Sequence, residues 1–258
     1  MEFVDTHCHL NHAQYAEDGA AVRERARAVG VTRLLCIGWD RASSRRAVDR
    51  AQEAGIYAAI GIHPESSEEW TDEGAAELRA LFDGNRAKVK AFGEIGLDYH
   101  WESASRERQQ AVFAAQIAFA RDLSPLLPLV IHCRDAQDDV LAVLRQAATP
   151  APIIMHCFTG DADAARACLD RGCYLGIGGV ATFKKSDALR EAIAFAPLDR
   201  LLLETDCPYL APQFRRGKRN EPGYLPAIAE TVAAAKQLPL ETIAEATTET
   251  ALALFGMA

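Results

Sequence analysis

The sequence predicts a closed (β/α)8 TIM barrel that occupies residues 1–258 as a single domain. Short runs of β-branched and apolar residues alternate eight times with longer segments of helical period, and 258 residues is an ordinary length for eight such units. No linker, low-complexity tract or block of charge divides the chain. An open doubly wound sheet is the alternative, but it favours a glycine-rich turn after the first strand. The residues from Asp5 to His9 contain no glycine, which favours the barrel.

We expect strands where β-branched and apolar residues are concentrated in short runs. In chain order these runs centre on residues 3–4, 34–35, 58–60, 89–92, 129–131, 153–155, 174–177 and 201–203. We expect helices where Ala, Arg and Glu predominate and apolar residues recur with helical period. These segments are residues 20–28, 43–54, 73–82, 105–122, 138–147, 162–170 and 187–195, with residues 225–236 and 240–255 after the last strand.

The composition is that of an ordinary globular protein, with 49% hydrophobic and 25% charged residues. The N-terminal sequence has no basic segment and carries Asp5, so it does not resemble a signal peptide. The longest strongly apolar stretch, near residues 123–131, is far shorter than a membrane span. Seven cysteines, an odd number in a chain of this length, favour a reduced compartment. We therefore expect a cytoplasmic protein with no membrane association, and we infer no obligate protein partner.

The formal net charge of -8 argues against a protein that coats duplex DNA by bulk charge, because such binding is mostly phosphate neutralisation. Local basic groups are nevertheless present near predicted strand ends. Arg134 follows the fifth strand, Lys184 and Lys185 follow the seventh, and a basic loop at residues 215–219 follows the eighth. Guanidinium groups bind phosphate in a bidentate manner, so Arg134, Arg216, Lys218 and Arg219 are candidates for binding substrate phosphate. From the residues alone, a solvated charged loop is the preferred interpretation of residues 215–219.

Five of the seven histidines lie at or just beyond the carboxyl ends of predicted strands: His7, His9, His63, His132 and His156. Two acidic residues, Glu94 and Asp206, share this location. A barrel gathers all eight strand ends into one mouth, where barrel enzymes place their chemistry. His12 and His100 lie elsewhere in the sequence, and we expect no role for them in the site.

The histidines and acids predict a metal site. His7 and His9 are two residues apart on a strand, so their side chains face the same side. Imidazole and carboxylate groups suit borderline divalent ions, and four histidines with two acids exceed what one tetrahedral ion needs. We therefore predict two ions that share a carboxylate, with ligands drawn from His7, His9, Glu94, His132, His156 and Asp206. His63 is not needed as a ligand, so we expect it to contact substrate, with a purely structural loop role as the alternative.

Cysteines directly follow four of these residues, at Cys8, Cys133, Cys157 and Cys207. A mixed Cys/His zinc site is therefore the rival interpretation. Strand alternation turns the first three thiols away from the neighbouring imidazoles, and the sequence has no C-x2-C pair of the structural zinc type. We expect the thiols to act as small apolar fillers between strands and helices.

Several motifs occur in an order that is specific as a set. They are VDTHCHL from Val4, GIHP from Gly61, GEIGLDY from Gly93, HCRDA from His132, HCFTG from His156, ETDCPYL from Glu204 and RGKRNEP from Arg216. Together they resemble the TatD family of metal-dependent deoxyribonucleases, within the amidohydrolase-like barrels. The resemblance extends from Phe3 to the C-terminal helices, which is nearly the whole chain.

The resemblance implies a two-metal centre at the mouth of a TIM barrel. One ion would be held by His7, His9, Glu94 and Asp206, and Glu94 would bridge to a second ion held by His132 and His156. It also implies cleavage of DNA, commonly as a 3′-to-5′ exonuclease, so we expect single-stranded DNA or strand ends as the substrate. Some relatives are linked to the removal of D-amino acids from tRNA, which leaves an ester or amide hydrolase, such as a D-aminoacyl-tRNA deacylase, as the alternative. A non-catalytic barrel is a third reading, against which the full ligand set argues.

The residues support phosphodiester hydrolysis independently. Two divalent ions, whether Mg²⁺, Mn²⁺ or Zn²⁺, can activate a water molecule and relieve charge on the phosphate. We expect Glu94 and Asp206 to be catalytic, with Asp206 accepting the proton of the attacking water. We expect Asp5 and Glu204 to orient ligand imidazoles, with plain polar packing as the alternative. Tyr99 and Trp101 are candidates for stacking on exposed bases or for packing the loop.

Overall fold

Each apolar run of the sequence forms one strand of an eight-stranded parallel sheet, and the strands follow one another in chain order. The computed structural model describes residues 1–101 and 103–257. An isolated parallel bridge between Cys8 and Cys207 joins the two edges of the sheet, so the predicted TIM barrel is confirmed. The strands are β1 (Phe3–Cys8), β2 (Val31–Ile37), β3 (Ile56–Ile60), β4 (Val89–Asp98), β5 (Leu129–Arg134), β6 (Ile153–Met155), β7 (Tyr174–Ile177) and β8 (Leu201–Leu203).

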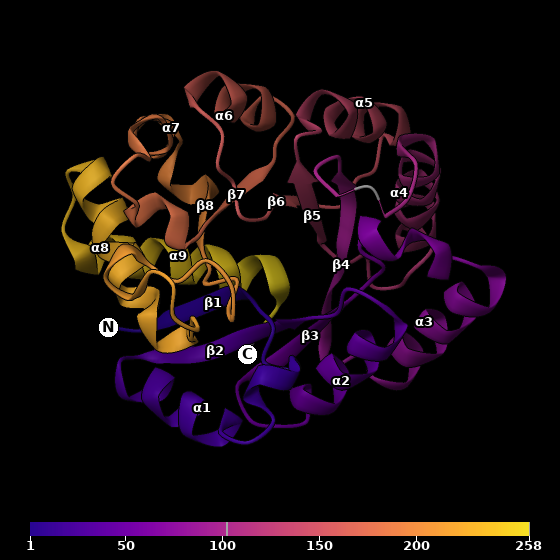
Figure 1. The fold of residues 1–258 in the computed structure, drawn as a ribbon, viewed down its shortest axis with the longest axis horizontal. Coiled ribbons are helices and arrows are strands. Elements are labelled where there is room, and N and C mark those ends of the chain that lie inside the picture. The colour runs from indigo at the N-terminus through magenta and orange to yellow at the C-terminus, as the bar shows by residue number, and fades with distance from the viewer. Residues whose placement is uncertain (102, 258) are drawn as a thin grey trace.

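Helices surround the strands, as Figure 1 shows, and each expected helical segment forms a helix. They are α1 (Gly19–Ala28), α2 (Arg41–Ala51), α3 (Asp72–Gly84), α4 (Arg106–Arg121), α5 (Gln137–Ala147), α6 (Ala162–Leu169), α7 (Asp187–Phe195), α8 (Leu225–Lys236) and α9 (Leu240–Phe255). Short 3₁₀ helices, which the sequence analysis did not anticipate, occupy η1 (Ala13–Tyr15), η2 (Pro64–Glu69), η3 (Gly179–Thr182), η4 (Leu198–Arg200), η5 (Gln213–Arg215) and η6 (Pro222–Tyr224).

Several helices begin at a side chain that accepts a hydrogen bond from the first turn. Asp40 accepts from the backbone N–H of Ser43 at the start of α2, and the Ser43 hydroxyl in turn accepts from Asp40. Thr71, Ser105 and Asp161 cap α3, α4 and α6 in the same way. Such caps satisfy N–H groups that have no partner inside the helix, so they fix where each strand-to-helix loop ends.

The interior of the barrel is apolar at the amino ends of the strands. One cluster contains inward-facing residues from most strands, including Val4, Leu35, Val130 and Leu202. Phe255 of α9, which is 3% exposed, packs in the same cluster. The helix α9 therefore closes the amino end of the barrel, and the carboxyl ends of the strands form the open mouth. Within residues 1–101 and 103–257, no helix has both the length and the apolar character that crossing a bilayer requires.

Candidate metal centre

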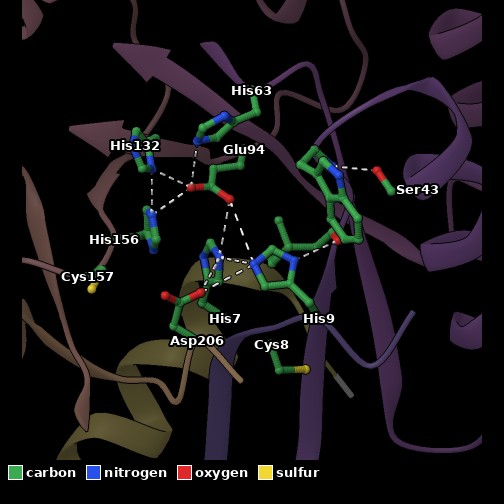
Figure 2. Close-up of polar contacts among 12 residues, drawn as sticks. His7, Cys8, His9, Ser43, His63, Glu94, His132, His156, Cys157 and Asp206 are labelled. Atoms are coloured by element: carbon green, nitrogen blue, oxygen red, sulfur yellow. Dashed lines mark hydrogen bonds and ion pairs between the residues drawn. The ribbon is translucent and has the colours of Figure 1, made fainter. Parts of the chain in front are cut away.

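Six side chains from five strand ends converge at the mouth of the barrel (Figure 2). His7 lies on β1 and His9 just after it, Glu94 lies on β4, His132 lies on β5, and His156 and Asp206 follow β6 and β8. All six are at least largely buried. Because parallel strands in a barrel end on the same side, residues far apart in sequence meet here.

Glu94 lies between two groups of histidines, and each of its carboxylate oxygens faces one group. Oε1 is 2.7 Å from Nδ1 of His132 and 2.7 Å from Nε2 of His156. Oε2 is 3.5 Å from Nε2 of His7 and 3.9 Å from Nε2 of His9. The single carboxylate therefore belongs to both groups.

Each group is a compact set of nitrogen and oxygen donors. In the first group, Nε2 of His7 and Nε2 of His9 are 3.3 Å apart, and Oδ1 of Asp206 is 3.3 Å from Nε2 of His9 and 3.7 Å from Nε2 of His7. In the second group, Nδ1 of His132 and Nε2 of His156 are 3.3 Å apart. Asp206 is held in place by its backbone, which adopts a left-handed conformation at φ 55° and donates from its N–H to the carbonyl of His7 at 2.8 Å.

The outer nitrogens of these rings determine which nitrogen faces the centre. Nδ1 of His9 is 3.3 Å from the carbonyl of Ile37, and Nε2 of His132 is 2.9 Å from Oδ2 of Asp98. A carbonyl or carboxylate can only accept, so these outer nitrogens carry the protons. In the neutral rings, lone pairs then point at Glu94 and at the neighbouring imidazoles. Such an arrangement calls for positive charge between the donors, and its mixture of imidazole and carboxylate fits a borderline divalent ion in each group.

The electrostatics of the centre agree with this need for positive charge. Burial opposes ionisation of Glu94, but His156 and His132 lower the pKa of its carboxyl well below the usual range. Burial likewise opposes ionisation of Asp206, and the hydrogen bond from His9 and the nearby His7 lower its pKa. Although burial opposes a charge on His156, Glu94 and Glu204 raise its pKa well above the ordinary histidine value. Both carboxylates are therefore anions at neutral pH, and the neighbouring acids favour protonation of His156 and His132, whereas burial and the nearby His156 lower the pKa of His7.

His63 faces the centre with a proton rather than a lone pair. Its Nδ1 accepts the backbone N–H of Glu65 at 3.1 Å, and its Nε2 lies 3.8 Å from Oε1 of Glu94. Burial and the neighbouring His132 lower the pKa of His63 to about 3, so the ring is neutral and its proton is on Nε2. This tautomer makes His63 a hydrogen-bond donor into the mouth, as a substrate-contacting residue requires.

Asp98 is a member of the site that the sequence analysis missed. Its Oδ2 lies 2.9 Å from Nε2 of His132, and its Oδ1 accepts the backbone N–H groups of His100 and Trp101 at 2.9 and 3.1 Å. Burial opposes its charge, but the hydrogen bond to His132 lowers the pKa of Asp98 to about 2. Strand alternation contains the signal that could have found it, because residues 94, 96 and 98 face the same side of β4.

The two acids expected to orient imidazoles behave differently. Asp5 does not contact an imidazole: its Oδ1 accepts the backbone N–H of Thr205 at 2.9 Å and that of His7 at 3.3 Å, and its Oδ2 accepts the Thr205 hydroxyl. Burial raises the pKa of Asp5 to about 7. The expected role of Asp5 is thus corrected to joining the backbones of the first and last strands. Oε1 of Glu204 lies 3.5 Å from Nδ1 of His156 and accepts the N–H of Cys157 at 2.5 Å.

The expected phosphate-binding residues separate into two sets. Arg134 lines the cavity above the centre, which has a volume of about 620 Å³. Among the described residues, the lining of this cavity includes none of Arg216, Lys218 and Arg219. Arg219 forms a bidentate ion pair with Asp18, at 2.9 and 2.6 Å, so its guanidinium is engaged elsewhere and its expected role is corrected. The guanidinium of Arg216 lies over the ring of Phe183 instead.

The thiols and aromatic residues also differ in part from expectation. Cys8 and Cys207 are buried fillers, and Figure 2 shows the Cys8 sulfur directed away from the centre. Cys133 and Cys157 line the cavity, so they are not purely internal fillers. The hydroxyl of Tyr99 donates to Asp139 at 2.8 Å and the guanidinium of Arg106 lies over its ring, which favours the alternative of a packing role for Tyr99. Trp101 does line the cavity.

Comparison with known proteins identifies the family to which the chain belongs. The family model "TatD related DNase" matches residues 4–256. "Uncharacterized metal-dependent hydrolase YabD" of Bacillus subtilis is 46% identical over 97% of this chain and 98% of its own length. "3'-5' ssDNA/RNA exonuclease TatD" of Pantoea ananatis is 36% identical over 98% and 99%. The crystal structure of YJJV, a TatD homolog from Escherichia coli K12, superposes with a TM-score of 0.93 at 29% identity, covering 99% of this chain and 98% of that one. The chain therefore belongs to the TatD family of metal-dependent hydrolases.

Proposed function

We propose that this protein is a metal-dependent deoxyribonuclease that hydrolyses phosphodiester bonds at the 3′ ends of single-stranded DNA. The observation that carries the proposal is the position of Glu94, whose two oxygens face two adjoining groups of imidazole donors. Such an arrangement suits a pair of divalent ions that share one carboxylate, which is a common arrangement in phosphodiester hydrolysis. The family match and the relatives named as 3′-5′ ssDNA/RNA exonucleases support the same substrate class.

The ligands divide as the distances suggest. His7, His9 and Asp206 would hold one ion, His132 and His156 would hold the other, and Glu94 would contact both. When bound, two such ions lower the pKa of a water molecule and neutralise charge on the phosphate oxygens. The residues fit Mn²⁺ or Zn²⁺ by their donor types, and Mg²⁺ is the common ion of phosphoryl chemistry.

Side chains around the centre would accept the proton of the attacking water and bind the phosphate oxygens. Asp206 is an anion that follows β8 at the rim, so its carboxylate can accept the proton of the attacking water. Nε2–H of His63 is oriented to donate to a phosphate oxygen. Arg134 lines the same cavity, and its guanidinium would bind a phosphate oxygen of the strand where it passes Trp101. Asp98 would hold the proton on the outer nitrogen of His132 by a hydrogen bond, and the carboxylate of Glu204, 3.5 Å from Nδ1 of His156, would favour a proton there by its charge.

One observation favours the alternative of a metal-dependent ester hydrolase, such as a D-aminoacyl-tRNA deacylase. Glu65 lines the cavity beside the metal centre. A carboxylate at the mouth, with Arg216, Lys218 and Arg219 outside the lining, weakens the attraction for a run of phosphates. A single scissile phosphate at a strand end is compatible with this arrangement, and so is an aminoacyl ester.

The test is a substrate panel with the holoenzyme loaded with Mn²⁺ or Mg²⁺. We expect single-stranded DNA labelled at its 5′ end to shorten progressively from the 3′ end, and D-aminoacyl-tRNA to remain intact. Glu94→Gln should abolish the shortening, whereas Glu241→Gln, at an exposed glutamate on α9, should not change it. Turnover of the aminoacyl ester without any DNA cleavage would contradict the nuclease assignment.

A further inference from the structure

Aromatic side chains line the cavity on two sides of the metal centre. Trp39 follows β2 and Tyr209 follows β8, and both flank His9, with ring centroids 5.1 and 5.9 Å from the imidazole. Trp101 follows β4 next to the other donor group, since Asp98 bonds both His132 and the backbone of Trp101. Tyr209 is 48% exposed and Trp101 is 52% exposed. Large aromatic surface is thus open to the cavity beside the site of chemistry.

The residues Trp39 and Tyr209, which we call the aromatic corner, are held in fixed positions by their backbones. The N–H of Trp39 donates to the hydroxyl of Ser43 at 2.8 Å, and its carbonyl accepts the N–H of His63 at 2.8 Å. The carbonyl of Tyr209 accepts the side-chain amide of Asn220 at 2.7 Å, and its N–H donates to the carbonyl of Asp206 at 2.9 Å. The two rings are therefore anchored to the same segments that carry His63 and Asp206.

The geometry of the aromatic corner suits a flat group that arrives with a phosphate. Both rings stand nearly perpendicular to the imidazole of His9, at 77° and 71°, so neither is stacked on it. The guanidinium of Arg46 lies over the Trp39 ring at 5.7 Å from its centroid, which leaves the opposite face of Trp39 for a ligand. The ring of His12 contacts both, with centroids 6.0 Å from Trp39 and 5.9 Å from Tyr209, but Trp39 and Tyr209 both line the cavity, and Tyr209 is 48% exposed. A nucleobase is a planar aromatic group that stacks on such faces with little dependence on sequence. It is separated from its own 5′-phosphate by a single sugar.

We propose that the aromatic corner binds the base of the 3′-terminal nucleotide, whose 5′-phosphate occupies the metal centre. This inference rests on the proposed nuclease function and adds a base-binding subsite to it. The rest of the strand leaves past Trp101, over whose ring the guanidinium of Arg134 lies at 5.6 Å from the centroid. With one aromatic surface on each side of the scissile bond, the enzyme should prefer unpaired strand ends. Only unstacked bases can contact both aromatic surfaces.

The test compares two chromogenic phosphodiesters with the Mn²⁺-loaded holoenzyme. In thymidine 5′-(p-nitrophenyl phosphate) and in methyl p-nitrophenyl phosphate, water attacks phosphorus and p-nitrophenolate leaves, but only the first compound carries a base. We expect Trp39→Ala and Tyr209→Ala each to raise KM for the thymidine ester roughly tenfold, since a stacked base contributes ~1–3 kcal/mol. The kinetics on the methyl ester should change less than twofold. Trp39→Phe should retain most of the affinity for the thymidine ester.

A matched control is Phe195→Ala. Phe195 is 46% exposed and has the guanidinium of Arg166 over its ring, but it ends α7 and is outside the cavity lining. This variant should hydrolyse both esters as the wild type does. Equal losses on both esters in Trp39→Ala would overturn the proposal, because the side chain would then act through His9 on the centre. An unchanged KM for the thymidine ester in both alanine variants would also overturn it.

A binding measurement separates failure of the subsite from failure of the proposed function. If the wild type hydrolyses neither ester, the nuclease assignment fails, and calorimetry with thymidine 5′-monophosphate and methyl phosphate then judges the subsite. We expect the holoenzyme to bind the nucleotide roughly tenfold more tightly than methyl phosphate, and Trp39→Ala to remove that difference. Equal affinity of the wild type for the two compounds would contradict a base-binding corner.

Discussion

The two ends of the barrel use the same eight strands for opposite purposes. At the amino end, Val4, Leu35 and Leu202 pack against Phe255 of α9 in an apolar cluster whose contacts are complete within the chain. At the carboxyl end, Glu94 and the imidazoles around it bury charge and lone pairs that the chain satisfies only in part, and Nδ1 of His7 has no hydrogen-bond partner among the described residues. The comparison indicates that one end stabilises the fold and that the other is the proposed cation site, so substitutions should separate the two properties.

The largest effect is expected at the carboxyl end. Glu94→Gln removes the one charge that both donor groups share, so activity should fall by roughly a thousandfold or more. Bound Mn²⁺, measured by mass spectrometry of the dialysed protein, should fall below one ion per chain. The thermal unfolding of the metal-free protein should show no loss of stability. A variant that retained both its metal content and its activity would show that Glu94 does not join the two groups.

At the amino end the expected effect is on stability. Phe255→Ala leaves a cavity where α9 meets the strands, which should lower the free energy of unfolding by ~3–5 kcal/mol. Denaturant titration measures this loss. Metal content and kcat of the folded fraction should remain those of the wild type. A large fall in metal affinity without a loss of stability would erase the distinction between the two ends.

Asp98 provides an intermediate effect that is restricted to one donor group. Asp98→Asn removes the carboxylate that holds the proton on Nε2 of His132, so the affinity of one of the two Mn²⁺ sites should fall roughly 10- to 100-fold. Calorimetric titration should resolve the weakened site from the unchanged one. Asp138→Asn, at an exposed acid on the neighbouring helix α5, is the control and should bind both ions normally. Equal weakening of both sites would mean that Asp98 acts on the whole centre.

The smallest expected effect is on KM, and it distinguishes Arg134, which lines the cavity, from Arg219, which does not. Arg134→Ala should raise KM for single-stranded DNA about fivefold, because an exposed guanidinium makes a modest contribution to binding phosphate. Arg219→Ala should leave KM unchanged, since that side chain is paired with Asp18. Steady-state kinetics at fixed ionic strength measure both. The reverse order of effects would mean that the basic loop at residues 215–219 binds the substrate.

The sequence predicted the barrel well because the apolar runs and the helical periods are properties of neighbouring residues. It also predicted which histidines and acids would meet, because strand ends in a barrel share one side. Contacts that depend on three-dimensional packing were predicted less well. Asp5 accepts a hydrogen bond from the backbone of Thr205, and Arg219 forms an ion pair with Asp18. In each pair the partners are about 200 residues apart in the sequence, so local patterns do not reveal them.

The loop residues around the mouth show the same limit. Trp39 and Tyr209 occur in loops where no periodicity applies, so only the folded chain shows that both flank His9. Asp98 could have been found from strand alternation, but that required knowing that β4 continues four residues beyond Glu94. The extended β4 is made possible by Gly96, at φ 144°, where a Cβ would lie 2.0 Å from the carbonyl of His132.

Anomalous scattering from a crystal of the protein equilibrated with Mn²⁺ tests the account most directly. We predict two peaks, one beside His7, His9 and Asp206 and one beside His132 and His156, with Glu94 in contact with both. A single peak, or none within reach of Glu94, would contradict the shared-carboxylate centre on which the proposed function depends.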